Sequence, residues 1–499
     1  MSSSDLEKNS VHQVEEVALH GHVATDKYGK PLVQLDEAAE ARLRRKIDLY
    51  ILPMVFLIYI FCFIDRANIG NARLAGLEKD LKLQGYDYNI LLTAFYVAYT
   101  VFEFPCQMIN KWMGPGRSIP LFTFLFGLFS FAMAFIHTFG AAIAVRFLLG
   151  ISEGAVFPGL ALYLSRFYRR DELGFRLACY IVGAPLAGAF GGLLASGILK
   201  IDSIGWLTQW RNIFFVEGII TMGIGAISWF VLPDRPEKCR WLTEEEKILA
   251  EARIKSENVG QTDVVDSMHK QAIWDGVFNT TTLVSSLIFL LDNITVQGVG
   301  FFLPTIIRTL YPGRSTIYVQ LMSVPPYITG SFTTLLVGYL SFKMKKRGLF
   351  MLLSAPFMVV GYAMYLATMD PQTRYAAAFM VGLGAFSFGS LCVTWSAANQ
   401  TSDSGRAAAI GTTVFFGNCG GLISTWMFLA KDGPRYIPGN ATNLTTSTLM
   451  FFLAGALWLW QIKENRAKDN GRDDHLLEGK TAEEIALLGQ RHPAFRFAH

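Results

Sequence analysis

Residues 144–158, AVRFLLGISEGAVFP, form an apolar run that two charged side chains interrupt, Arg146 and Glu153. The two residues are seven positions apart, which is close to two helical turns, so both side chains project from nearly the same face. A charge inside a membrane helix is costly and is found mainly at functional sites. The stretch therefore predicts a membrane-spanning helix that carries polar groups of a functional site.

The composition of the chain is typical of a protein that crosses the membrane many times. Of its 499 residues, 52% are apolar and only 17% are charged, whereas a soluble protein carries roughly 25% charged residues. The net charge of +4 gives no support for nucleic-acid binding. The six cysteines form no CxxC or Cys/His cluster, so neither a disulfide framework nor a metal site is expected. No P-loop or other catalytic motif indicates an enzyme, and no cofactor is expected.

Apolar segments of the length of a spanning helix, which is about 20 residues, occur twelve times. They lie near residues 47–71, 88–110, 118–137, 140–164, 175–199, 212–232, 277–303, 317–341, 349–368, 374–398, 407–430 and 441–461. The predicted fold is therefore an all-α polytopic membrane protein with two six-helix halves, at residues 47–232 and 277–461. Such halves are expected to be related as repeats.

Hydrophilic segments flank and separate the two halves. Residues 233–276 are expected to form a cytoplasmic linker, in which Thr243 and Glu246 make a capping box that opens a charged surface helix. Residues 1–46 and 462–499 are the predicted tails. Lys and Arg gather before the first span, in the 4–5 and 8–9 turns and after the last span, which predicts that both tails are cytoplasmic. The sequons at Asn440 and Asn443 would then lie on the outer side, as low-grade candidates for glycosylation.

Burial disfavours the charged form of a carboxylate, so Glu153 is predicted to gain and lose a proton. Arg146 keeps its charge, and its planar guanidinium matches a carboxylate anion. Contacts within one helix favour spacings of three and four, so each residue is expected to find its partner on another helix or on a substrate. A purely structural ion pair is the alternative. Arg66, in the first span, is expected to join the same chamber.

Further polar groups interrupt other spans. Asp292 in the seventh span is the second candidate proton site, since a lone carboxylate at that depth must be neutral or partnered. Glu103 in the second span is interpreted as a structural or gating group. The candidates for the substrate path also include Asn68, Asn293 and Gln297. Tyr96, Trp395 and Asn418 are further candidates, for which ordinary helix packing is the alternative.

Three stretches, FIDRANIGNA at 63–72, VRFLLGISEGAVFPG at 145–159 and AKDGPRYIPG at 430–439, resemble the fungal allantoate-permease branch of the anion:cation symporters. This branch belongs to the major facilitator superfamily, and the high-affinity nicotinate transporters are the most similar group. The resemblance implies alternating-access uptake of an organic anion with protons. It also implies that Arg66 and Arg146 recognise the anion and that Glu153 couples its movement to a proton. A substrate arginine of the seventh span in some relatives has no counterpart here.

The superfamily's gating signature between the second and third spans is kept only in part. The stretch NKWMGPGRSIP, residues 110–120, retains Gly114 and Arg117 but carries Asn110 and no Asp. The resemblance assigns Gly114 and Arg117 to gating.

The favoured function is proton-coupled import, by a monomer in the plasma membrane, of a small vitamin-like carboxylate such as nicotinate, allantoate or pantothenate. Export of a secondary metabolite or drug by the same fold is the alternative, although GAPLAGAFGG at 183–192 lacks the Gly-Pro-x-x-Gly-Gly form of antiporters. A non-transporting nutrient receptor is a third and weaker possibility, because such receptors carry longer tails.

Overall fold

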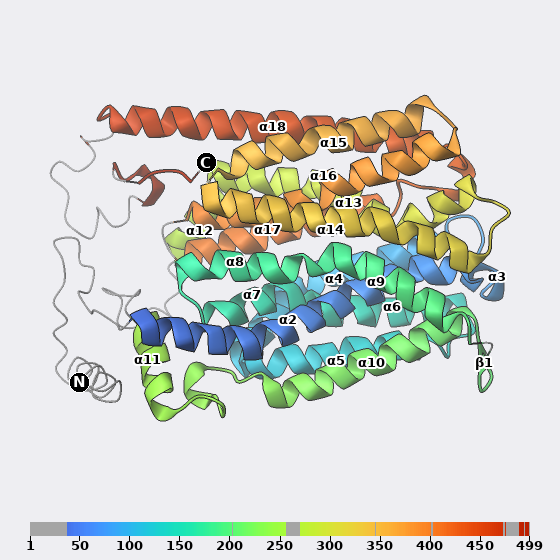
Figure 1. The fold of residues 1–499 in the computed structure, drawn as a ribbon, viewed down its shortest axis with the longest axis horizontal. Coiled ribbons are helices and arrows are strands. Elements are labelled where there is room, and N and C mark those ends of the chain that lie inside the picture. The colour runs from blue at the N-terminus through green and yellow to red at the C-terminus, as the bar shows by residue number, and fades with distance from the viewer. Residues whose placement is uncertain are drawn as a thin grey trace.

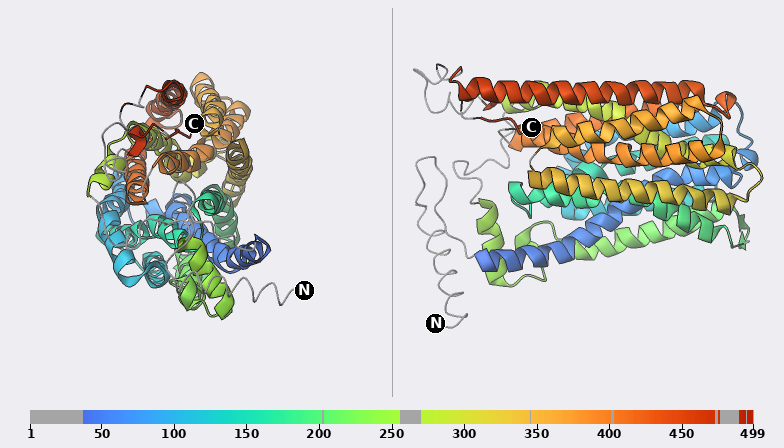
Figure 2. Two further views of the ribbon diagram at one scale, coloured as in Figure 1. Left: turned by 90° about the vertical axis from the view of Figure 1, so that its left-hand side faces the viewer. Right: turned by 45° about the horizontal axis from the view of Figure 1, so that its top comes forward.

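The computed structural model describes residues 37–201, 203–255, 270–344, 346–400, 403–472, 475, 489–493 and 495–498. Their long helices run side by side along the long axis of the molecule (Figure 1). Seen end-on, the helices coloured blue to green and those coloured yellow to red form two groups (Figure 2). The start of α2 and the C-terminus lie at the same end of the bundle (Figure 1), as an even number of crossings requires.

The first group follows the predicted order of spans. It contains α2 (Glu37–Leu74), α3 (Leu77–Asp80), α4 (Asp87–Met113), α5 (Pro115–Met133), α6 (Phe139–Gly154), α7 (Val156–Ser165), α8 (Arg170–Ile181), α9 (Gly183–Ile198) and α10 (Trp210–Val231). A short hairpin of β1 (Ser203–Ile204) and β2 (Leu207–Thr208) precedes α10. The predicted fourth span is formed by α6 and α7 together, and the fifth by the end of α8 with α9.

The second group contains α13 (Thr280–Leu310), α14 (Thr316–Met344), α15 (Arg347–Ala367), α16 (Pro371–Ala398), α17 (Asp403–Ser424) and α18 (Ile437–Asp469). Short 3₁₀ helices lie at η1 (Pro236–Lys238), η2 (Ala430–Asp432) and η4 (Gly489–Arg491), and the linker adds α11 (Glu244–Lys255) and α12 (Lys270–Val277).

Eleven of the described helices are long and apolar enough to cross a bilayer. They correspond to eleven of the twelve predicted spans. The exception is α14, which lies in the bundle beside α9 and α16 but carries Pro325, Pro326 and many Ser and Thr residues. These residues lower its mean hydropathy, while its length of 29 residues is ample for a crossing.

Helix α11 of the linker begins with the predicted capping box. The Thr243 backbone N–H donates to Glu246 Oε2 at 2.9 Å, and the Glu246 N–H donates back to Thr243 Oγ1 at 3.2 Å, which is a capping box. Helix α2 starts ten residues before the predicted span because its polar first turns have partners. Arg253 of α11 donates to Glu40 of α2 and to Glu172 of α8, each at 2.7 Å.

This network sets the charge of Glu172. Burial acts to raise the pKa of Glu172, but the Arg253 guanidinium and the hydrogen bond from Arg44 outweigh burial, so the pKa lies below its usual value. Glu172 is therefore an anion that ties α2, α8 and α11 together.

Glycines permit the closest contacts between the two groups of helices, where α9 packs on α14, α2 on α13 and α4 on α17. A Cβ added to Gly70 of α2 would lie 2.8 Å from the carbonyl oxygen of Phe301 in α13. A Cβ added to Gly188 of α9 would lie 2.5 Å from the ring of Tyr327 in α14. The two groups therefore meet through small residues, as membrane helices that approach closely commonly do.

The last described residues dock onto the second group. The Phe497 N–H donates to Asn465 Oδ1 at 2.8 Å, and Asn465 Nδ2 donates to the Phe497 carbonyl at 2.9 Å. The Ala498 N–H donates to Asn399 Oδ1, and the Ala498 carbonyl accepts from the Trp395 indole, both at 2.8 Å. The C-terminal segment is thus held at the cytoplasmic ends, by the predicted orientation, of α16 and α18.

Candidate functional site

An ion pair between α2 and α6 forms the centre of the candidate site. Arg66 donates to Glu153 Oε2 from Nε at 3.2 Å and from Nη2 at 2.9 Å. The two residues are 5% and 0% exposed. The expectation that Glu153 finds its partner on another helix is met, and the partner is the arginine that was expected in the same chamber.

The surroundings of this pair are aromatic and apolar. The Arg66 guanidinium carbon lies 4.7 Å from the Phe63 ring centroid and 4.9 Å from that of Tyr99, distances at which ring faces attract cations. The Cys62 thiol donates to Glu153 Oε2 at 3.5 Å. Within the described part of the chain, Glu153 Oε1 has no hydrogen-bond partner. One carboxylate oxygen therefore holds the arginine, and the other is left without a donor.

Arg146 lies on the same helix as Glu153 but is not paired with it. Its side chain is buried, and its guanidinium carbon lies 5.5 Å from the Phe214 ring centroid of α10. Among the residues that the structure describes, neither Nε nor Nη2 of Arg146 has an acceptor. A buried cation with unsatisfied donors is costly. Arg146 thus has donors that no described residue satisfies, and it is not among the residues that line the cavity at Arg66.

A second buried acid on α2 precedes Arg66. Asp65 accepts hydrogen bonds from Ser130 Oγ of α5 at 2.8 Å and from Thr221 Oγ1 of α10 at 3.1 Å. It is fully buried, so it is a group of the interior of the first group of helices.

A small cavity lies between the two groups of helices, beside Arg66. Its volume is about 20 Å³, about that of one water, against the ~300–1,000 Å³ of ligand sites. Binding of an organic anion here requires the two groups to move apart. The lining consists of Phe63, Arg66, Ala67, Ala184, Gly188, Val296, Gln297, Gly300, Phe301, Tyr327 and Phe386.

Gln297 of α13 lines this cavity from the side of the second group. Its Nε2 donates to Asn293 Oδ1 at 3.3 Å, and Asn293 Nδ2 donates to the Phe289 carbonyl at 3.0 Å. Asn293 therefore lies one turn behind Gln297 and orients it. Asp292 is buried, and neither of its oxygens has a partner within the described residues. Asp292 Oδ2 lies 3.6 Å from the position of a Cβ at Gly389 of α16, so it faces the interior of the second group.

Three further candidates lie where the two groups meet. Asn418 of α17 donates to Glu103 Oε2 of α4 at 2.7 Å, which joins a predicted gating residue to a predicted substrate residue. The Tyr96 ring lies 2.4 Å from the position of a Cβ at Gly421. Asn68 accepts a long hydrogen bond of 3.4 Å from Asn71. Glu103, Asn418 and Tyr96 thus join the two groups of helices.

The structure does not bring Trp395 to this site. Its indole N–H donates to Gln461 Oε1 at 3.0 Å and to the Ala498 carbonyl, so the side chain anchors the C-terminal segment. The prediction that Trp395 lines the substrate path is corrected, because an aromatic residue in a spanning helix gives no sequence signal for the direction in which it points.

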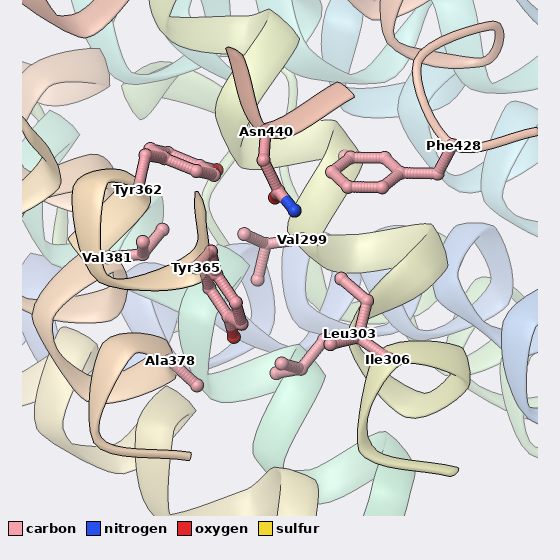
Figure 3. Close-up of a pocket in the computed structure, with 10 residues that line it drawn as sticks. Val299, Leu303, Ile306, Tyr362, Tyr365, Ala378, Val381, Phe428 and Asn440 are labelled. Carbon is pink, nitrogen blue, oxygen red and sulfur yellow. The ribbon is translucent and has the colours of Figure 1, made fainter. Parts of the chain in front are cut away.

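The two sequons are also corrected. The Asn440 side chain is 1% exposed and Asn443 is fully buried, with Asn443 Oδ1 accepting from Thr295 Oγ1 at 2.9 Å. Asn440 lines a second cavity of about 10 Å³ within the second group, where Tyr362, Val299 and Phe428 surround it (Figure 3). A glycan on either amide cannot be accommodated in this conformation.

The predicted gating loop contacts an acid from elsewhere in the chain. Asp234, just after α10, accepts from the Gly116 N–H at 3.2 Å and from Arg166 Nη1 at 3.0 Å. Gly114 has a φ of +84°, and a Cβ added there would lie 2.4 Å from the Asp234 carboxylate, so the loop requires glycine. Arg117 is exposed. Asp234, which sequence reasoning missed, thus supplies the acid that the loop itself lacks.

Comparisons with known proteins agree with this architecture. The sequence profile of the Major Facilitator Superfamily matches residues 55–425. The chain is 33% identical to an uncharacterized transporter of Schizosaccharomyces pombe, over 88% of this chain and 86% of that protein. It is 31% identical to the high-affinity nicotinic acid transporter of Saccharomyces cerevisiae, over 92% of this chain and 85% of that protein.

Among solved structures, a bacterial homologue of the human lysosomal transporter Spinster, in an inward-facing and occupied conformation, has a TM-score of 0.59. It is 15% identical in sequence, and the match covers 82% of this chain and 96% of that one. These proteins are named as transporters, and no catalytic family is indicated.

Proposed function

The chain belongs to the major facilitator superfamily of membrane transporters, and on that premise we propose that it imports a small organic carboxylate together with a proton. The proposal also places the protein in the plasma membrane, as a monomer with both tails in the cytoplasm, in agreement with the distribution of Lys and Arg.

One observation carries the proposal: the cation that lines the cavity between the halves is held by an acid that a proton would neutralise. Arg66 lines the cavity, and Glu153 binds Arg66 from within the first half. While Glu153 is charged, the guanidinium is occupied. A proton on Glu153 removes the charge that holds Arg66, which then binds the carboxylate of the substrate.

Arg146 supports the same reading. Its Nε and Nη2 lack acceptors across the described residues, whereas a buried arginine ordinarily has its donors satisfied. An anion that enters between the halves gives these donors an acceptor. The substrate carboxylate then replaces the charge of Glu153, which the proton has neutralised, so the net charge beside the two arginines is unchanged during the crossing.

The cycle follows from alternating access. The protein opens outward with Glu153 protonated, and the anion docks against Arg66 and Arg146. The halves then rock about the contacts between α2 and α13, α4 and α17, and α9 and α14. Facing the cytosol, Glu153 loses its proton and recaptures Arg66, which releases the anion. Asp292 is assigned as a second proton site, within the second half.

The walls of the cavity favour a flat ring on the substrate. Phe63, Phe301 and Phe386 surround the space between Arg66 and Gln297, and aromatic walls favour a planar partner. Gln297 would contact a polar atom within the ring while Arg66 binds the carboxylate. Nicotinate has these features, and the similarity to the nicotinic acid transporter supports it as the first candidate, followed by allantoate, pantothenate and biotin.

Uptake by transporter-null cells that express this chain tests the proposal. Radiolabelled nicotinate, allantoate, pantothenate and biotin are supplied at two external pH values, with and without an agent that collapses the proton gradient. We expect saturable uptake of one of them that rises at the lower pH and falls when the gradient collapses.

Two variants locate the site in the same assay. Arg146→Ala should abolish this uptake while reaching the cell surface, and Arg314→Ala, which removes an exposed arginine of the α13–α14 turn, should leave it intact. Uptake that is indifferent to the gradient, or normal in Arg146→Ala, would refute the proposed mechanism.

A further inference from the structure

A buried acid on α10, Glu217, takes no part in the mechanism above. The stretch FFVEGIIT at 214–221 interrupts an apolar helix with one carboxyl, as the fourth span is interrupted at Glu153. Glu217 is 0% exposed, and neither of its carboxyl oxygens has a hydrogen-bond partner within the residues that the structure describes. A carboxyl group left in this state inside a membrane helix is costly, and such groups mark functional sites.

The neighbours of Glu217 on its own helix belong to the site. Phe214 is three residues before it and Thr221 four residues after it, so all three side chains lie on one face of α10. The Phe214 ring lies under the Arg146 guanidinium, and Thr221 Oγ1 donates to Asp65. The residues on either side of Glu217 on this face thus contact the unsatisfied cation, through Phe214, and the second buried acid, through Thr221.

Thr221 and Asp65 connect the face of Glu217 to the central ion pair. Thr221, one turn after Glu217, donates to Asp65 Oδ2 at 3.1 Å, and Asp65 directly precedes Arg66, which is bound to Glu153. Both Asp65 oxygens already accept hydrogen bonds, from Ser130 and Thr221, which leaves Glu217 as the carboxyl without a donor.

Few other titratable groups face Glu217 from the elements that pack on α10. From α2 comes Asp65, whose neighbour Arg66 is bound to Glu153 of α6, and Arg146 of α6 contacts Phe214 of α10. Helix α5 offers only Arg117 at its far end, and α9 offers none. On α10 itself, Arg211 lies at the start of the helix, where it is bound to Asp80.

Glu217 and Arg146 lie at similar distances from the starts of their helices, and Glu153 lies farther along. Glu217 and Arg146 each lie seven residues, or about 10 Å, from the first residue of their helices, Trp210 and Phe139. Glu153 lies twice as far along α6. Helices α5, α10 and α2 run side by side over this region (Figure 1).

We propose that Glu217 carries a proton and exchanges it with Asp65, so that the Arg66–Glu153 pair is supplied with protons from the side of the bundle where α6 and α10 begin. In each transfer, the O–H bond of protonated Glu217 breaks as one forms on the Asp65 carboxylate, and Glu217 regains a proton from water. The inference rests on the proposed proton coupling, but the protonation of Glu217 itself does not depend on any substrate.

Transport assays on the reconstituted protein distinguish a proton relay from a purely structural role of Glu217. Radiolabelled nicotinate is the probe, and two modes are compared: uptake driven by a proton gradient, and exchange of labelled for unlabelled nicotinate at equal pH, which moves no net proton. Glu217→Gln should slow the driven uptake by roughly tenfold and leave exchange unchanged. Glu217→Asp, which keeps a titratable group, should recover part of the driven rate. Glu78→Gln, a half-exposed carboxyl, is the control.

Equal loss of both modes in Glu217→Gln, or no loss in either, overturns the relay. Infrared difference spectra after a pH jump give a readout without substrate. The carboxylic-acid band of Glu217 should titrate in the wild type and be missing in Glu217→Gln. If no probe is transported but this band titrates, the proposed substrate fails and the proton site stands. A spectrum that Glu217→Gln leaves unchanged refutes the site.

Discussion

Replacing Glu153 by Gln removes the charge that holds Arg66 and keeps the shape of the side chain. In the proposed cycle this variant mimics the protonated state permanently. It should therefore bind and exchange the anion, but it should not concentrate the anion in response to a proton gradient.

The structure sets the size of the two expected effects. Side chains of the pair are 6% and 0% exposed, and removal of one partner from such a buried pair costs about 3–5 kcal/mol. The amide oxygen of Gln can still accept from Arg66, and a hydrogen bond to a charged group is worth about 1.5–3 kcal/mol. Glu153→Gln should therefore destabilise the protein by only about 1–2 kcal/mol, less than Glu153→Ala.

The functional effect is larger. One proton carried with a monovalent anion allows a gradient of two pH units to concentrate the anion about 100-fold, since each unit is worth about 1.4 kcal/mol. In Glu153→Gln the ratio should fall toward one, while equal-pH exchange of labelled nicotinate stays close to the wild-type rate. Proteoliposomes measure both quantities in one preparation. Accumulation that still follows the gradient would show that Glu153 does not couple the proton.

Three further outcomes are expected. Arg146→Ala should reach the cell surface and lose uptake by on the order of 100-fold, while Arg146→Lys keeps the charge but loses the planar fork and should recover only part; surface labelling with uptake separates the two. Gly70→Ala should lower the melting temperature and slow transport, because its Cβ would lie 2.8 Å from a backbone oxygen of α13 and overpacking costs about 1–3 kcal/mol. Gly223→Ala in α10, where an added Cβ would meet nothing within 4 Å, should match the wild type, and equal losses in both would contradict the packing argument. Since the folded pKa of Glu172 is depressed, its network should stabilise the protein above about pH 4.3 and fail as pH falls through the folded pKa. Melting temperature should then fall more steeply in acid for the wild type than for Glu172→Gln, and parallel curves would refute this.

Apolar length predicted the bundle because a lipid environment admits few alternatives to a helix. Apolar length is a weaker signal at α14, because prolines and hydroxyl side chains lower the hydropathy of a helix that still lies in the bundle. It also placed the start of α2 too late, because the partners of its polar first turns lie on α8 and α11, far along the chain.

Charges in apolar runs predicted which residues matter but not which of them pair. Arg66 and Glu153 are 87 residues apart, and no spacing rule connects them. Glu217 carries the same signal as Glu153, an acid in an apolar run, but no second charged residue accompanies it in the middle of its span, so its segment is less conspicuous in the sequence. No pattern in the sequence indicates the direction in which the Trp395 side chain points. The direction that a side chain takes depends on how helices rotate against one another, which the hydropathy of a single helix does not specify.

The docked C-terminal segment has a practical consequence for those who purify or image this protein. The carbonyl of Ala498 is held by Trp395 and Asn399. A fluorescent protein or affinity peptide joined directly to this segment would thus pull on an anchored backbone, and the reporter would weaken the seam between α16 and α18 that it is meant to leave undisturbed. A long flexible spacer between Ala498 and the reporter avoids that strain.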